Sequence, residues 1–197
     1  DGIPEGWERK KITDLSFVID GTHDSPKPVE EGYYLVTGRH IVNGFIDFSQ
    51  CYMISEEDHR KVMQRSKPEK GDIIFSNIGT LGSTVLVDQE FEFSIKNVAL
   101  FKPLENRYSN FLYLYFSDPI NLQSMHAKAS GTSQRFFSLK LLRGLKILTP
   151  TITLLKLFNL HIEPILKQRS LLNKQNQKLS QARDLLLPRL MNGEITV

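Results

Sequence analysis

The stretch PTITLLKLFNLHIEPILKQRSLLNKQNQKLSQARDLLLPRLMNGEI, residues 150–195, decides the architecture of this chain of 197 residues. Large apolar side chains recur in it at intervals of seven, at Phe158, Ile165, Leu172, Leu179 and Leu186. A strict heptad keeps one seam of a helix facing a partner over several turns. We therefore expect a long helix from about Pro150 to Leu187, kinked at Pro164, that serves as a spacer or docking arm.

A second line of the same helix is mixed in character: Leu155, Ile162, Arg169, Asn176 and Arg183. The two arginines disfavour a symmetric parallel zipper because burying like charges is costly, whereas one asparagine can set the register. The pattern favours antiparallel pairing or packing on a different surface; a helix folded back on its own domain is the alternative. The expected interface residues are Phe158, Ile162, Ile165, Leu172, Asn176, Leu179 and Leu186.

The totals fit one ordinary domain with an extension, or two small domains. No apolar run approaches the ~18 residues of a membrane span, so no membrane partner is expected. The only cysteine, Cys51, excludes an internal disulfide and fits a reducing compartment, which places the chain in the cytoplasm. We expect Cys51 to be a small, half-buried hydrophobe.

Charge is distributed unevenly along the chain. Residues 119–162 contain no Asp or Glu, and their basic side chains are Lys128, Arg135, Lys140, Arg143, Lys146 and Lys156. Residues 1–118 carry 13 basic and 19 acidic side chains, a net charge of −6. A local basic block beside an acidic region suits a phosphate-facing edge. The alternative is a solvated surface that happens to lack acids.

Residues 1–103 are predicted to be β-rich, with strands at residues 15–20, 33–37, 72–77, 84–88 and 91–101. Asn43-Gly44 predicts a hairpin, and Ser55 a capped helix. Helices are expected over residues 109–129, with a break at Asp118-Pro119, and over residues 139–143, and a strand over residues 145–148. The predicted fold class is therefore α+β: a mixed, β-rich globular domain (residues 1–149), then a long C-terminal coiled-coil-type helix (residues 150–197).

Catalytic signatures are missing from the sequence. The five histidines are scattered, with no HExxH or CxxC spacing, so no metal site is expected. There is no Walker or GxGxxG loop, no GxSxG elbow, and no Asn/Asp-Pro-Pro-aromatic tetrapeptide of the kind expected in an amino-methyltransferase. We interpret the chain as non-catalytic and expect no cofactor. A nuclease or methyltransferase is the alternative that these absences argue against.

Three stretches in order carry a resemblance to a known family. They are IPEGWERKKITDL (residues 3–15), KPEKGDIIFSNIGTLGSTVLVD (residues 67–88) and SGTSQRFFSLKLLRGLKILTP (residues 130–150), and the helix then closes with LLPRLMNGE. Together they resemble the DNA specificity (S) subunit of type I restriction–modification enzymes. The likeness covers nearly the whole chain, but only as one half-unit: one target-recognition domain followed by one spacer helix.

The resemblance implies a non-catalytic subunit that reads a split site on double-stranded DNA. It implies methyltransferase (M) subunits as partners, which bind S-adenosylmethionine, and restriction (R) subunits that join through the complex. A second half-unit, or a second copy of this chain, would pack antiparallel through the long helix. The competing interpretation is a protein-interaction adaptor that acts through that helix.

Four loops are candidates for DNA contact, because base edges are read by polar side chains such as Arg, Gln, Asn and Thr. The first choice is residues 130–135, the second residues 77–83, the third residues 37–40, and the weakest residues 21–27. The DNA-contact candidates are Ser130, Thr132, Ser133, Gln134, Arg135, Asn77, Thr80, Arg39, His40 and Lys27, with Lys140 and Arg143 for phosphates. A polar connector, a plain hairpin turn and a solvated helix face are the alternatives.

Overall fold

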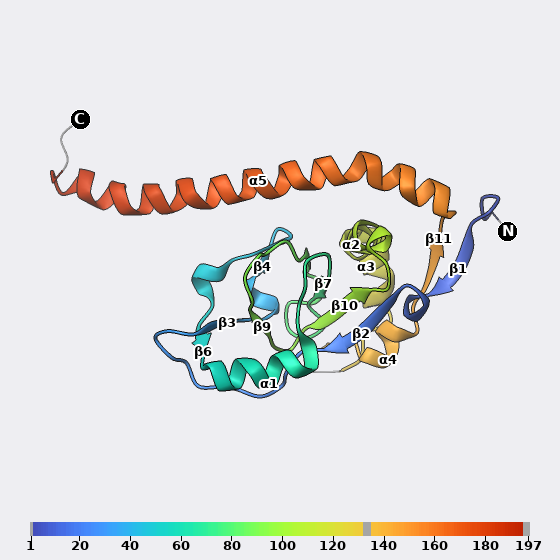
Figure 1. The fold of residues 1–197 in the computed structure, drawn as a ribbon, viewed down its shortest axis with the longest axis horizontal. Helices are drawn as coiled ribbons and strands as arrows, with labels where there is room; N and C mark the ends of the chain where they lie inside the picture. Colours follow the sequence, from blue (N-terminus) through green and yellow to red (C-terminus); the bar gives the residue numbers. More distant parts are fainter. Residues whose placement is uncertain (1, 132–134, 195–197) are drawn as a thin grey trace. The chain divides into compact units, whose positions relative to one another are not determined.

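The computed structural model describes residues 2–131 and 135–194. The chain forms two compact units, one reaching to Asn159 and the other beginning at Leu160. The first unit is mixed α and β, as predicted, and the long helix α5 (Ile152–Met191) continues from it into the second (Figure 1).

A four-stranded antiparallel sheet forms the centre of the first unit. Its order is β2 (Ser16–Asp20), β10 (Ala99–Pro103), β7 (Ile73–Phe75) and β8 (Thr84–Leu86). All neighbouring strands in it are antiparallel. The strands expected over residues 15–20, 72–77 and 84–88 are thus confirmed, with narrower bounds.

The prediction of a single strand over residues 91–101 is wrong, because the segment forms two strands. Asn97 has a φ of 53°, the left-handed conformation that ends an extended run. β9 (Ser94–Ile95) lies before it and β10 after it. β9 is not part of the central sheet. It pairs in parallel with β3 (Tyr33–Val36), which also pairs antiparallel with β6 (Met53–Ile54).

Two strand pairs complete the β structure. The predicted hairpin is present, joining β4 (Ile41–Val42) to β5 (Phe45–Ile46). Its turn residues Asn43 and Gly44 have φ values of 53° and 78°, as a type I′ turn requires. The second pair joins β1 (Glu8–Lys11), which was not predicted, to β11 (Lys146–Thr149), which was.

Side-chain caps fix the short helices where the sequence indicated. The Ser55 hydroxyl accepts a hydrogen bond from the Asp58 amide at 3.2 Å, and the Ser138 hydroxyl accepts one from the Leu141 amide at 3.1 Å. The break at Asp118 is confirmed, because its carboxylate caps the second of two helices. The helices are α1 (Glu56–Ser66), α2 (Ser109–Ser117), α3 (Pro119–His126) and α4 (Leu139–Arg143), and the 3-10 helices are η1 (Ile12–Asp14), η2 (Gly38–His40), η3 (Phe48–Gln50) and η4 (Asn106–Tyr108).

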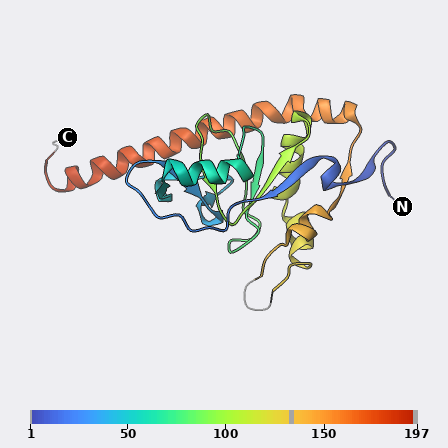
Figure 2. The same cartoon turned by 60° about the horizontal axis from the view of Figure 1, so that its bottom comes forward.

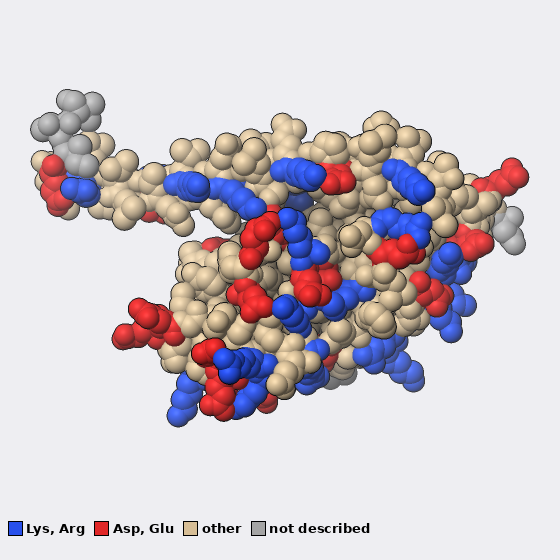
Figure 3. All heavy atoms as spheres, in the orientation of Figure 1, with Lys and Arg blue, Asp and Glu red and all other residues tan. Residues whose placement is uncertain are grey.

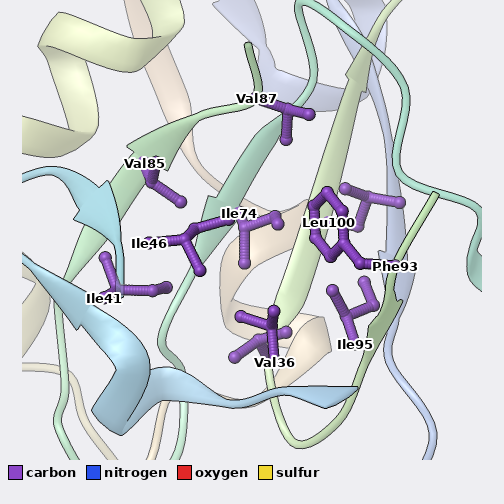
Figure 4. Packing of buried hydrophobic residues seen from close by; sticks show 10 residues of the cluster. Val36, Ile41, Ile46, Ile74, Val85, Val87, Phe93, Ile95 and Leu100 are labelled. Carbon is purple, nitrogen blue, oxygen red and sulfur yellow. The ribbon is translucent and has the colours of Figure 1, made fainter. Parts of the chain in front are cut away.

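The core lies on both faces of the central sheet, because successive side chains of a strand point to opposite faces. On one face, aliphatic residues of seven strands pack together (Figure 4). On the other, an aromatic group joins the sheet to α2: Phe116 lies 4.3 Å from Phe101 and 5.1 Å from Phe75, between ring centroids. Phe137, which follows the first-choice loop, stacks on Phe75 at 5.6 Å. That loop is therefore attached to the core on its C-terminal side.

The long helix begins two residues later than expected. Thr149 is buried in β11, and the Thr151 hydroxyl accepts the Leu154 amide at 3.3 Å instead. The first turns belong to the first unit, because Leu155 is buried and Asn159 donates to the Arg107 carbonyl at 2.8 Å. α5 is 40 residues long in all. It contains two internal prolines, Pro164 and Pro188, and ends at Met191, four residues beyond the expected end at Leu187.

None of the helices in the described part of the chain combines the length and apolarity that a membrane crossing needs.

His40 makes the first unit sensitive to acid. Its side chain is buried in η2, where Nδ1 accepts the Thr37 amide at 3.0 Å. Burial, and then the charge of Arg39, lower the pKa of His40 below its ordinary 6.5. The unfolded chain therefore binds this proton more readily than the folded chain. Stability from a neutral His40 should fall as pH drops below about 6.5.

We predict that His40→Asn, which keeps an acceptor but cannot titrate there, loses less stability than the wild type between pH 7 and pH 5 in urea unfolding. His23→Gln is the control, because the pKa of His23 is shifted in the opposite direction to that of His40. Hydrogen bonds to Asn97 and then Asp20 raise the pKa of His23, so its contribution is present below pH 6.5 and lost as pH rises through the raised value. His23→Gln should therefore steepen the acid loss. Identical pH profiles for all three proteins would contradict the assignment.

Candidate nucleic-acid interface

The loop between β7 and β8, residues 76–83, is closed by its own backbone. The Ser76 amide donates to the Ser83 carbonyl at 2.8 Å, and the Gly82 amide donates to the Ser76 carbonyl at 2.9 Å. Gly79 and Gly82 have φ values of 79° and 91°, which other residues rarely adopt. This β7–β8 loop holds the exposed Thr80 at its tip.

The third-choice segment, residues 37–40, packs directly against the β7–β8 loop. A Cβ at Gly38 would lie 2.1 Å from the Ser76 Oγ and 2.8 Å from the Thr80 Oγ1. Only glycine permits this approach without a shift of the two loops. The contact brings the exposed Arg39, whose Nε lies 3.1 Å from the His40 Nε2, to the side of the β7–β8 loop.

The flanks of the first-choice loop pair with the same β7–β8 loop. The Phe137 amide donates to the Asn77 carbonyl at 2.9 Å, and the Asn77 side-chain amide donates back to the Phe137 carbonyl at 3.2 Å. Phe136 forms bridges with both Ile78 and Ser130. Figure 2 shows the described flanks leaving the first unit beside α4, drawn in orange.

Three sequence-distant segments thus form one surface, which we call the loop surface: residues 37–40, residues 76–83, and residues 130–131 with 135–137. Its exposed polar side chains are those of Arg39, Thr80, Ser130 and Arg135. The Arg135 guanidinium donates to the His126 carbonyl at 2.5 Å, which holds it at the base of the loop. Three of the four loops named from sequence therefore come together.

Two candidates on this surface are buried, and they support it from inside. His40 is 1% exposed and Asn77 is 4% exposed. In this conformation their side chains bond the Thr37 amide and the Phe137 carbonyl. Thr132, Ser133 and Gln134 lie outside the described residues.

The fourth-choice loop is fixed at another place. The Thr22 amide donates to the Ile95 carbonyl at 3.1 Å, and the His23 ring lies 2.8 Å from the Asn97 Oδ1 and 2.7 Å from the Asp20 Oδ2. These contacts tie the loop to the turn between β9 and β10. Lys27 is exposed on it.

The two phosphate candidates on α4 have different surroundings. Lys140 is exposed. The Arg143 guanidinium donates to the Val18 carbonyl at 3.2 Å from Nε and 2.8 Å from Nη2. It thereby satisfies a carbonyl of β2, which is one of the two edge strands of the central sheet. Lys and Arg side chains gather over α4 and β1 in Figure 3.

Cys51 is half-buried, as expected, and packs against the aliphatic core. Burial raises the pKa of its thiol to about 12. Among the described residues, no group of three or more His, Cys, Asp or Glu side chains is placed to hold a metal ion.

The seam of the long helix is largely exposed in the single chain. Ile165, Leu172, Leu179 and Leu186 are 58%, 50%, 67% and 52% exposed. Asn176 is exposed as well, and Phe158 and Ile162 are partly exposed.

Sequence reasoning missed two features of the site. One is the basic strand β1, where the polar run ERKK lacks the alternation that marks a strand. The other is Gly38, whose need for glycine comes from a contact 38 positions away in sequence, at Ser76. Only the glycine itself was visible in the sequence as a signal.

Comparisons with family models and with known proteins agree on one family. Residues 4–153 match the family described as the type I restriction modification DNA specificity domain. Over 98% of its length the chain is 26% identical to the type I restriction enzyme HindI specificity subunit of Haemophilus influenzae, of which it covers 42%. It is 24% identical over 99% of its length to the MjaIX specificity subunit of Methanocaldococcus jannaschii, of which it covers 46%. The chain thus spans less than half of these relatives.

Solved structures share the fold. The S subunit of a type I restriction–modification system from M. genitalium has a TM-score of 0.64 at 17% identity, with 96% of this chain and 46% of that one covered. The HsdS subunit from Thermoanaerobacter tengcongensis has a TM-score of 0.56 at 15% identity, with 99% and 47% covered. Since the family match takes in most of the sequence, the chain belongs to the type I restriction modification DNA specificity domain family.

Proposed function

We propose that this chain is one recognition half of a type I restriction–modification specificity subunit, in which the first unit reads a DNA half-site. The observation that carries the proposal is the loop surface. Three segments from distant parts of the sequence are held together there by direct contacts, and Arg39, Thr80 and Arg135 are exposed on them. The names of the relatives, all specificity subunits, support the same function.

The exposed side chains suit base readout in the major groove. An arginine can donate two hydrogen bonds to the O6 and N7 of guanine, and a threonine hydroxyl can donate or accept. The loops are preassembled by Gly38, Asn77 and Phe137, so little conformational entropy should be lost on binding. Lys140 on the neighbouring α4 adds a positive charge for phosphates.

In this proposal the chain itself catalyses nothing. It positions methyltransferase subunits, and restriction subunits join the complex, so that chemistry at the DNA depends on sequence read by the first unit. The name "specificity subunit" borne by its relatives supports this division of labour.

The long helix acts as spacer and docking arm in the same proposal. Forty residues of helix are about 60 Å long at 1.5 Å per residue. Its exposed heptad seam would pack antiparallel on the helix of a second half-unit or a second copy of the chain, which avoids facing Arg169 and Arg183 with themselves. Two recognition units would then lie a fixed distance apart on a split site.

The decisive experiment selects duplexes from a randomised library with the chain and its methyltransferase partner, and then titrates the selected duplex. We predict that Arg39→Gln relaxes the preference at one base position, at a cost of about 1–3 kcal/mol. Lys27→Gln is the matched control, with the same charge change on the loop that is tied to the turn between β9 and β10. Equal binding of all duplexes by the wild type would remove the proposed function and leave the adaptor interpretation.

Gly38→Ala should weaken discrimination although residue 38 itself carries no side chain that could contact DNA. Its Cβ would collide with Ser76, so the two loops must separate, and we expect a loss of about 1–3 kcal/mol in stability as well. Adding Ser76→Gly removes the two Ser76 atoms that collide and leaves the Thr80 Oγ1 at 2.8 Å, so it should restore part of both losses. Thermal unfolding and duplex titration measure the two effects, and a Gly38→Ala chain with wild-type behaviour would show that the close approach is unimportant.

Helix pairing can be tested with two double variants whose positions are 14 residues apart in both cases. Leu172→Lys with Leu186→Lys places charges on the seam, whereas Leu171→Lys with Leu185→Lys places them one position aside, on side chains 57% and 72% exposed. We predict that only the seam pair abolishes association in analytical ultracentrifugation, because buried unpaired charges are costly. Loss of association in both variants, or in neither, would contradict the heptad assignment.

A further inference from the structure

The strand pair β1–β11 presents basic side chains on one face. Lys11 lies directly opposite Lys146, Arg9 opposite Leu148, and Lys10 opposite Ile147. Because cross-strand partners share a face and successive residues alternate, Arg9, Lys11 and Lys146 point to the same side. All three are exposed, whereas Ile147 on the other face is buried. We call this face the basic ribbon.

Two like charges, those of Lys11 and Lys146, lie opposite each other in the basic ribbon. Like charges directly opposite each other in adjacent strands are destabilising. In the described part of the chain none of its three basic side chains forms a salt bridge. The acids on either side of Arg9 and Lys11 in sequence have other partners: Glu8 pairs with Lys10 at 3.6 Å, and the Asp14 carboxylate accepts a hydrogen bond from the Lys11 amide at 3.0 Å.

The ribbon continues the positive charge of the loop surface. The chain runs from Arg135 on that surface through α4, with Lys140, into β11 with Lys146, and no acid interrupts this stretch. β1 then adds Arg9 and Lys11 from the other end of the unit. Figure 3 shows Lys and Arg side chains over β1 and over α4, with some acidic side chains between the two groups.

We infer that the basic ribbon is a second contact site, which binds backbone phosphates of the DNA next to the bases read by the loop surface. The inference rests on the proposed function, since it names how the same DNA is held. A phosphate between Lys11 and Lys146 would turn their repulsion into two charge-assisted hydrogen bonds. Lysines serve this purpose as point charges without base preference. Continuity with the acid-free stretch favours DNA over an acidic protein surface.

The test uses the full chain with its methyltransferase partner and two matched double variants. Lys11→Gln with Lys146→Gln removes the opposed pair. Lys61→Gln with Lys70→Gln removes two exposed lysines that each already hold a salt bridge of 2.7 Å. Affinity for the selected duplex and for an unrelated duplex is measured over a salt series, together with thermal unfolding of the free chain.

We expect the ribbon variant to lower the slope of log K against log salt by about 0.9 for each phosphate that its side chains no longer neutralise. Both duplexes should be weakened by the same factor, because phosphate binding carries no sequence information. The free ribbon variant should unfold at the same temperature or up to about 4 °C higher at low salt, because the repulsion is relieved. The control pair should change neither the salt slope nor the ratio of the two affinities.

Each other outcome separates the two proposals. An unchanged salt slope with intact discrimination overturns the ribbon and leaves the proposed function standing. If the ribbon variant lowers the salt slope but the wild type does not discriminate between the two duplexes, the ribbon binds phosphates and the proposed function is wrong. If the ribbon variant loses the methyltransferase subunit but binds DNA with the wild-type slope, the ribbon binds an acidic protein surface, and the phosphate assignment is wrong. A wild type that binds no duplex at low salt overturns both.

Discussion

The close approach of the Gly38 backbone to Ser76 is the contact on which the loop surface depends. It leaves no room for a side chain at residue 38, and it aligns two loops that share no strand pairing. The β7–β8 loop then serves as the common partner, because its Asn77 pairs on the other side with Phe137. Phe137 in turn is stacked on Phe75 in the aromatic core. The exposed polar side chains are thus supported by the aromatic core through two buried residues, Asn77 and Phe137.

This arrangement separates scaffold from readout. Buried groups such as His40, Asn77 and Phe137 hold the backbone. Arg39, Thr80 and Arg135 are exposed on it, and each makes a side-chain contact with the protein, to His40, to Ser76 and to the His126 carbonyl. Substitutions at the exposed positions can therefore change what is read without unfolding the unit. Arg143 is an exposed arginine that is held more firmly, because two of its guanidinium nitrogens donate to the Val18 carbonyl of β2.

Features set by short-range rules were predictable from the sequence. The type I′ turn at Asn43-Gly44, the break at Asp118-Pro119 and the cap at Ser138 each depend on a few neighbouring residues. Features set by distant partners were not. β1 becomes a strand only because residues 146–149 lie beside it, and the run over residues 91–101 is divided because β9 pairs with β3. In the site, the loops were identified by composition, but the burial of His40 and Asn77 depends on packing that no local pattern reveals.

Hydrogen–deuterium exchange on the chain, with and without its selected duplex, tests the central claim most directly. If the loop surface grips the DNA, protection on binding should be concentrated in residues 37–40, 76–83 and 135–137, with residues 21–27 unchanged. Protection confined to residues 21–27, or to α1, with the loop surface exchanging as in the free chain, would contradict the account.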